Sequence, residues 1–262
     1  MRAKGLACAV LLSWLLVSGV QAGETWPVRI GVVPLKGRSG LLESVLLEKI
    51  LHARMPGVEV LALRGRVEPI RGGFAPSTER ELRQMTAASA ELPDLLIGYA
   101  WTAGDAQGDA RQIRVSLEIR DPLRDEIVAS MAASSRPRKM GMPGSENAAL
   151  SEAASKAGDA LLQEIRRYSK QQAEQGHLMR VILLGAPEGL ADKLQAALEP
   201  ELGPFTRLPG GQGWDIRSQK DSLALFNDLM DRIGKLAPDC APSMLASSSP
   251  YFVLKLEKKR SR

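Results

Sequence analysis

Residues that build metal sites and nucleophilic active sites are scarce in this chain. It has two histidines, His52 and His177, and two cysteines, Cys8 and Cys240, among 262 residues. A metal site rich in histidine needs more ligands, and neither histidine lies in an H-E-x-x-H motif. A hydrolase serine needs a strained G-x-S-x-G turn, which the stretch Gly37 to Gly40 does not match. The sequence therefore predicts no catalytic residue, no metal ligand and no cofactor.

Aromatic residues are also few, at 4% of the chain. Trp214 lies between Gly213 and Asp215 near the start of an expected strand. It is a candidate anchor for a partner protein, and packing in the core is the alternative. Acidic residues give no clear motif either. Asp105, Gln107 and Asp109 imitate the start of a calcium loop, but the twelfth position, counted from Asp105, is Ser116 rather than the glutamate that such a loop needs.

The amino terminus has the three parts of a secretory signal peptide. Arg2 and Lys4 precede an almost wholly apolar run from Gly5 to Val20, and small residues stand where a peptidase would cleave after Ala22. The apolar run is shorter than the roughly 20 residues that a retained membrane span needs. We therefore expect residues 1–22 to be removed and the protein to be periplasmic or secreted.

The basic charge of the chain is concentrated at its end. The formal net charge is +5, and five basic residues lie between Lys255 and Arg262. A nucleic-acid groove would spread basic residues along folded elements with aromatics between them, so we expect no nucleic-acid partner. Lys258, Lys259 and Arg260 are candidate contacts to anionic lipid, the cell wall or an acidic partner. A solvated terminus is the alternative.

The stretch from Val28 to Arg54 predicts a strand, a Gly-rich turn and an amphipathic helix. The helix repeats Leu42, Leu46 and Ile50 on one face, and Ser39 is placed to cap its first turn. Helix amino termini attract anions, so Arg38, Ser39 and Gly40 are candidate anion contacts. The alternative is that the glycines only allow a tight turn.

Further elements of the first module follow from hydrophobic periodicity. We expect a hairpin of residues 112–120 and 126–132, with Ile127, Ala129 and Met131 facing the core. A long helix over residues 146–172 carries an apolar stripe rich in alanine. The other expected elements are a strand at 58–63, a helix from Thr78 to about Ala90 and a strand at 94–101.

A second, smaller module is expected to begin near Gly176. Its pattern is a strand at 179–184, a helix at 190–202, a hairpin at 205–217, a helix ending near Leu236 and a strand at 251–256. The order β-α-β-β-α-β predicts helices on one face of a sheet. Cys240 lies between prolines, so we expect a loop there. Because Cys8 leaves with the signal peptide, an intramolecular disulfide is excluded.

A strand with Gly98 precedes a hairpin that carries Arg114, Val115, Leu117, Ile119 and Asp121 on one strand and Glu126 to Val128 on the other. On these residues the first module resembles the amino-terminal domain of TolB, and similar domains occur in curli-secretion, penicillin-binding-protein-activator and flagellar-assembly proteins of the envelope. The resemblance covers about Val28 to Tyr168 and implies a mixed sheet with helices on one face. The chain departs from the usual turn of these domains at Asp121 to Glu126 and lacks a lipoprotein cysteine motif.

The sequence thus predicts an α/β to α+β protein with a signal peptide (1–22), a TolB-like domain (23–172), a small α+β module (177–256) and a basic tail (257–262). The favoured function is that of a non-enzymatic periplasmic accessory or assembly protein, whose partner is an envelope protein complex. Two alternatives stay open: a periplasmic protein that binds a small ligand between its modules, and a hydrolase of wall glycan that uses two facing carboxylates.

Overall fold

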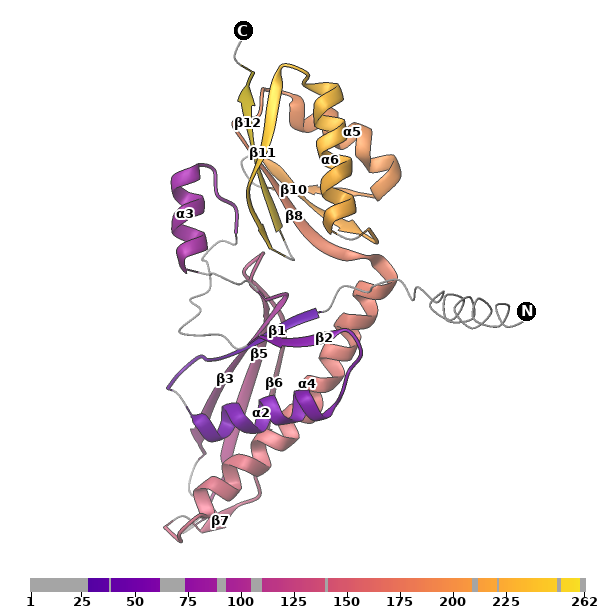
Figure 1. Ribbon diagram of the computed structural model, residues 1–262. Coiled ribbons are helices and arrows are strands. Elements are labelled where there is room, and N and C mark those ends of the chain that lie inside the picture. Colours follow the sequence, from indigo (N-terminus) through magenta and orange to yellow (C-terminus); the bar gives the residue numbers. More distant parts are fainter. Residues whose placement is uncertain are drawn as a thin grey trace, which may run out of the picture.

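The computed structural model describes residues 28–37, 39–61, 74–88, 93–104, 110–139, 141–208, 212–220, 222–248 and 251–259. Two five-stranded sheets lie at opposite ends of an elongated molecule, and one long helix leads from the first sheet to the second (Figure 1). This arrangement confirms the predicted mixture of α/β and α+β structure. The predicted signal peptide, Arg38 and Arg260 lie outside the described residues.

The first sheet is mixed. Its strand order is β2-β1-β3-β5-β6, in which β1 runs parallel to β2 and β3, and β5 runs antiparallel to β3 and β6. A two-stranded ribbon of β4 (Ala110–Arg111) and β7 (Arg138–Lys139) lies beside it. The five strands are β1 (Val28–Pro34), β2 (Val58–Leu61), β3 (Leu95–Ala103), β5 (Ile113–Asp121) and β6 (Glu126–Ser134).

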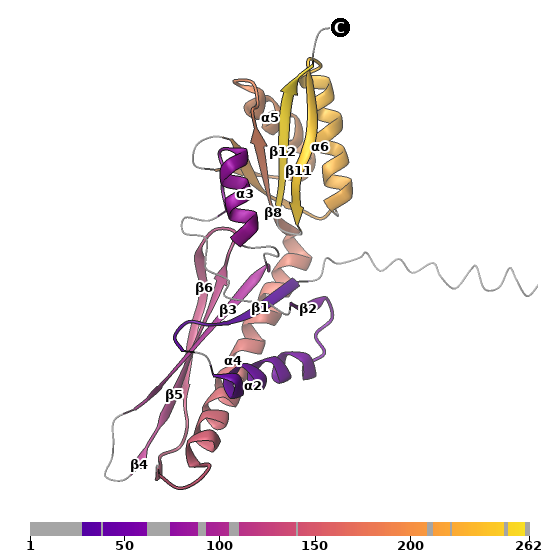
Figure 2. The same ribbon diagram turned by 60° about the vertical axis from the view of Figure 1, so that its left-hand side comes forward.

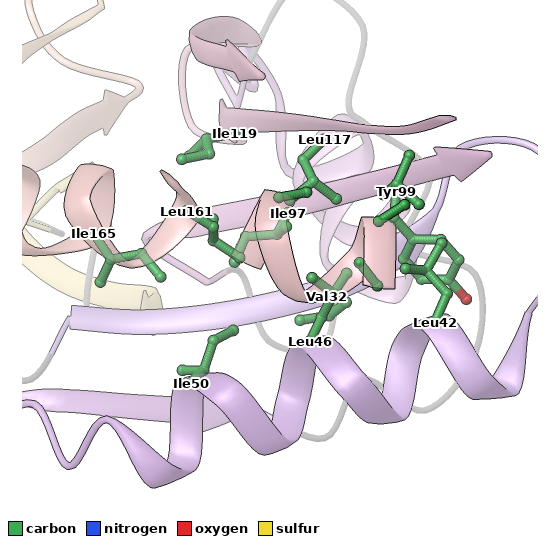
Figure 3. Packing of buried hydrophobic residues seen from close by; sticks show 14 of the residues in the cluster. Val32, Leu42, Leu46, Ile50, Ile97, Tyr99, Leu117, Ile119, Leu161 and Ile165 are labelled. Carbon is green, nitrogen blue, oxygen red and sulfur yellow. The ribbon is translucent and has the colours of Figure 1, made fainter. Parts of the chain in front are cut away.

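Helices α2 (Gly40–His52) and α4 (Ser145–Gln175) cover the same face of this sheet. Leu42, Leu46 and Ile50 of α2 are buried against the strands, as their spacing predicts (Figure 3). The stripe of α4 is buried too, and its small residues let α2 come close. At Gly158 a Cβ atom would lie 2.6 Å from Cδ of Lys49, which crosses α4 at this point.

One side of β6 differs from the prediction. Ala129 and Met131 pack against the core, but Ile127 is 52% exposed. The register shifts between Ile119 and Arg120, so Ile119 pairs with Ala129 while Arg120 pairs with Ile127. This bulge at Val128 moves Ile127 to the opposite face of the sheet, because one extra residue reverses the alternation of side chains. A period-two pattern alone does not reveal such an insertion.

The second sheet has the order β11-β12-β8-β10-β9. The predicted hairpin of β9 and β10 is present. The predicted loop around Cys240 is wrong, because these residues form β11, which pairs antiparallel with β12. Pro242 is compatible with this strand because β11 is at the edge of the sheet. The elements are β8 (His177–Leu184), α5 (Leu190–Leu202), β9 (Phe205–Arg207), β10 (Gly213–Ser218), α6 (Ser222–Leu236), β11 (Cys240–Ser248) and β12 (Tyr251–Lys258).

Both faces of the second sheet are covered. Helices α5 and α6 pack on one face, and α6 buries Leu225, Leu229 and Ile233, whereas Leu223 near its start is 67% exposed. Helix α3 (Glu79–Ala88) lies against the other face (Figure 2). The first module therefore sends α3 to the second sheet, which corrects its expected place in the TolB-like domain.

Candidate functional site

The densest group of buried charges lies where the two modules meet. Arg180 of β8 forms a two-pronged ion pair with Asp215 of β10, with Nε–Oδ1 at 2.7 Å and Nη2–Oδ2 at 2.8 Å. The two side chains are only 6% and 8% exposed. Nη1 of Arg180 also donates to the carbonyl oxygens of Phe74, at 3.1 Å, and Leu123, at 2.6 Å. One guanidinium thus joins the second sheet to two segments that precede it in the chain.

A second arginine continues this group. Nε of Arg124 lies 3.5 Å from Oδ2 of Asp215 and 3.7 Å from Oδ2 of Asp121. Oδ1 of Asp121 accepts hydrogen bonds from the backbone N–H groups of Leu123, at 2.9 Å, and Arg124, at 3.2 Å. Burial raises the pKa of Asp121, against the lowering effect of Arg124. The turn between β5 and β6 is therefore held in the shape that presents Leu123 to the second module.

Apolar packing surrounds the charges. Phe74, Leu82 and Leu123 form one buried cluster with Ile182, Leu184, Leu208, Tyr251 and Val253 of the second module. The rings of Phe74 and Tyr251 lie 4.2 Å apart. Nζ of Lys255 reaches Glu79 of α3 at 2.5 Å. These side chains fill the junction. Their packing does not favour the alternative in which a small ligand binds between the modules.

Asp94 lies near this group and has an unusual pKa. Its Oδ2 accepts a hydrogen bond from the backbone N–H of Arg29 at 2.6 Å. Burial raises the pKa of Asp94 to about 6, and the nearby Asp121 carboxylate adds to the rise. The pKa of Tyr168 is raised for the same reasons. Such shifts can mark active sites, but Asp94 and Asp121 each accept bonds from backbone N–H groups. Their arrangement orders the polypeptide at the junction.

The pKa of Asp94 predicts how stability depends on pH. The raised pKa means that the folded state holds a proton more tightly than the unfolded chain does, so stability falls as the pH rises from about 4 to about 6. Asp94→Asn keeps an acceptor for Arg29 without the charge. We expect the variant to be more stable than the wild type at pH 7.5, by at most about 3 kcal/mol. Urea unfolding at several pH values measures this.

The same comparison supplies its own control. Below pH 4 the difference between Asp94→Asn and the wild type should vanish, because Asp94 is then protonated in both the folded and the unfolded state. His177, whose pKa burial lowers to about 4, destabilises both proteins equally on acidification. A difference that stays constant from pH 3.5 to pH 7.5 would contradict the assignment.

Two of the predicted anion contacts, Ser39 and Gly40, lie at the start of α2. The Ser39 hydroxyl oxygen accepts the backbone N–H of Leu42 at 3.4 Å, and Gly40 is the first residue of α2. The hydroxyl of Tyr99 donates to Oε2 of Glu43 at 3.1 Å in the same turn. A carboxylate thus already lies at this helix start, which favours the capping alternative over an anion site.

Replacing Ser39 tests this role. Ser39→Ala removes the cap and should lower the free energy of unfolding by about 1 kcal/mol. Ser39→Asp keeps a capping oxygen and should restore most of that loss. Thermal unfolding of the two variants decides the matter, and a Ser39→Asp protein as unstable as Ser39→Ala would rule out capping as the role of Ser39.

The other predicted contacts are scattered. Trp214 is fully buried and meets Phe205 edge to face, with centroids 5.9 Å apart, so its proposed role as a surface anchor is wrong and core packing is correct. Lys258 is the exposed last residue of β12. Nζ of Lys259 donates to the carbonyl oxygen of Pro238 at 2.6 Å. The sequence reasoning missed Arg180 and Asp215, although a charge inside the apolar strands MRVILL and WDIR was a visible signal.

Other surface features carry less chemistry. A groove of about 440 Å³ runs between α2 and α4, lined by residues that include Glu48, Lys49, His52 and Arg166. Within the described ranges, three or more potential metal ligands never gather in one place. Nor does the part of the chain that the structure describes hold a helix long and apolar enough to cross a bilayer.

Comparisons with known proteins give only distant likenesses. No family model and no curated protein matches the chain. Among solved structures, PelC from Paraburkholderia phytofirmans, crystallised as a dodecamer, has a TM-score of 0.29 and 11% identity, covering 50% of this chain and 86% of PelC. Protein XCC0632 from Xanthomonas campestris has a TM-score of 0.33 and 11% identity, covering 58% and 93%. A minor lipoprotein from Acinetobacter baumannii has a TM-score of 0.28 and 13% identity, covering 55% and 94%.

Similarity at this level does not establish a shared function. The resemblance to TolB-like domains therefore stays a prediction.

Proposed function

We propose that the protein is a non-enzymatic accessory or assembly protein of the bacterial cell envelope that acts through protein–protein contacts. The signal-peptide pattern of residues 1–22 supports its export. The ion pair of Arg180 and Asp215 holds the two modules together. The buried carboxylates near it, whose pKa values are raised, therefore have a structural role. A surface must then carry the contact, and the edge strand β6 has the properties required.

The observation that carries the proposal is the composition of β6. From Ile127 to its last residue, Ser134, it has eight consecutive residues without a charge or a proline, and most are small. It ends the first sheet, with β5 as its one partner among the described strands. Natural sheet edges of this length normally carry lysine or proline, since an unprotected edge pairs with other strands. An uncharged edge is typical of strands that accept a partner.

The other edges of the two sheets differ. Strands β2 and β9 have four and three residues. Strand β11 has nine residues, but it contains Pro242 and its register shifts between Met244 and Ala246. Prolines and bulges both discourage strand addition. The contact surface is therefore assigned to β6 rather than to these edges.

Recovery of partners from the envelope tests the proposal. We compare wild-type protein with Ala132→Lys, which places a charge on β6, after cross-linking in intact cells and purification. The wild type should recover a defined envelope complex, and the variant should recover much less. Ser116→Lys is the matched control. Ser116 of β5 pairs with Ala132, so this substitution adds the same charge one strand inside the edge. A wild type that recovers no envelope protein would contradict the proposed function.

A further inference from the structure

We propose that β6 pairs antiparallel with β6 of a second copy of this chain, so that the two first sheets join into one. The inference rests on the proposed role of β6 as a contact surface and names its occupant. Three features support a second copy: the direction of the free backbone groups, the distribution of charge at the two ends of β6, and the exposed apolar residues beside the bulge.

The backbone of β6 fixes which residues face the free edge. The N–H of Ser135 donates to the carbonyl oxygen of Ile113 on β5 at 2.9 Å. Because bonding directions alternate along an antiparallel strand, Ala133 and Met131 also bond toward β5. Ser130, Ala132 and Ser134 then direct their N–H and C=O groups away from β5. The carbonyl oxygen of Ser134 already accepts a hydrogen bond from Nζ of Lys156 at 3.2 Å. A second copy can bond to the remaining groups of these three residues about a two-fold axis at Met131 or at Ala132.

The charges at the ends of β6 are complementary under this symmetry. An axis at Met131 brings Glu126 opposite Arg136 of the other copy, and an axis at Ala132 brings it opposite Arg138. The Glu126 side chain is 64% exposed, and those of Arg136 and Arg138 are 86% and 40% exposed. A parallel pairing in register would instead place Glu126 against Glu126, which is unfavourable.

The end of β6 near Arg136 and Arg138 carries a net positive charge. Glu152 of α4 is shared among Arg138, at 3.0 Å, Lys156, at 2.9 Å, and Arg136, at 3.9 Å. These hydrogen bonds lower the pKa of Glu152 to about 2. Three cations around one carboxylate leave a net positive patch. The antiparallel partner brings the Glu126 carboxylate to this patch on each side of the axis, so the interaction occurs twice.

The same arrangement would bury the exposed apolar residues at the start of β6. Ile127 and Val128 are 52% and 36% exposed, because the bulge turns Ile127 out of the core. With either axis, the segment of the second copy that follows Ala133 lies beside them. Apart from Met131, the side chains between the two ends are alanine and serine, which permit close backbone approach.

The mass of the purified exported protein in solution tests the inference. We expect sedimentation equilibrium to give twice the chain mass at high protein concentration, with reversible dissociation on dilution. Ala132→Pro removes an N–H that points away from β5 and therefore leaves the β5–β6 ladder intact. It takes two hydrogen bonds from each dimer and should raise the dissociation constant about tenfold or more. Ala132→Lys should act in the same direction, and Ser116→Lys should not.

Two results would overturn the inference. One is a wild type that stays monomeric at every concentration, and the other is a dimer whose dissociation constant neither Ala132→Pro nor Ala132→Lys changes. A cooperative thermal unfolding transition shows whether each variant is folded. If Ala132→Pro does not fold, the dissociation constant of Ala132→Lys provides the test. A monomer that still recovers an envelope complex through β6 would contradict pairing with a second copy but would not contradict the proposed function. A dimer that recovers no envelope protein would support the pairing and contradict the proposed function.

Discussion

Replacing Arg180 by leucine is expected to destabilise the protein by about 3–5 kcal/mol, which is the cost of leaving one partner of a buried ion pair alone. Asp215 would lose both of its short hydrogen bonds, and the carbonyl oxygens of Phe74 and Leu123 would lose their donor. Arg124, 3.5 Å from Asp215, compensates only in part because it also faces Asp121. The midpoint of urea unfolding measures the loss.

The double variant Arg180→Leu with Asp215→Leu is the informative control. Removing both charges takes away the unpaired carboxylate, so most of the loss should be recovered, apart from the two carbonyl groups. If the double variant is as unstable as Arg180→Leu, the destabilisation comes from lost packing and not from an unpaired charge.

Replacing Gly176 by alanine should cost about 3 kcal/mol, because two effects add. Gly176 ends α4 with φ at 85° and ψ at 161°, a conformation that is essentially restricted to glycine. An added Cβ would also lie 2.6 Å from the backbone C and O atoms of Ser218. The backbone of β10 and that of the end of α4 cannot move apart without disturbing their hydrogen bonds. Thermal unfolding should show a large drop in the midpoint.

Gly144, at the other end of α4, separates the two effects. It also has a positive φ, of 78°, but an added Cβ would meet no atom within 4 Å. Gly144→Ala should therefore cost only about 1 kcal/mol from its backbone conformation. Equal losses at the two positions would contradict this account, because neither the conformation of Gly176 nor its close approach to Ser218 would then add to the cost of a positive φ.

Local patterns predicted much of the first module. The i, i+4 repeat of Leu42, Leu46 and Ile50 identified the buried face of α2, and Ser39 identified its start. The alanine stripe of α4 was equally clear, since Ala153, Ala157 and Leu161 are all buried. These features depend on neighbours within a few turns of chain, so the sequence alone carries them.

Features that depend on distant contacts were not predicted. The position of α3 is set by Phe74, Leu82 and the second sheet, which are far apart in sequence. The bulge at Val128 and the strand around Pro242 are visible only once pairing partners are known. Of the candidate site residues, Ser39 caps α2, Gly40 begins it, and Trp214 is buried, because composition shows which residues are present and not where they face.

Hydrogen exchange at β6 tests the central claim most directly, because it reads the two sides of one strand separately. At high protein concentration the backbone amides of Ser130, Ala132 and Ser134 should be protected together with those of Met131 and Ala133. On dilution, or in Ala132→Lys, Ser130 and Ser134 should lose protection while Met131 and Ala133 keep theirs. If Ser130 and Ser134 exchange rapidly at every concentration and in the presence of envelope extract, β6 is not the contact surface.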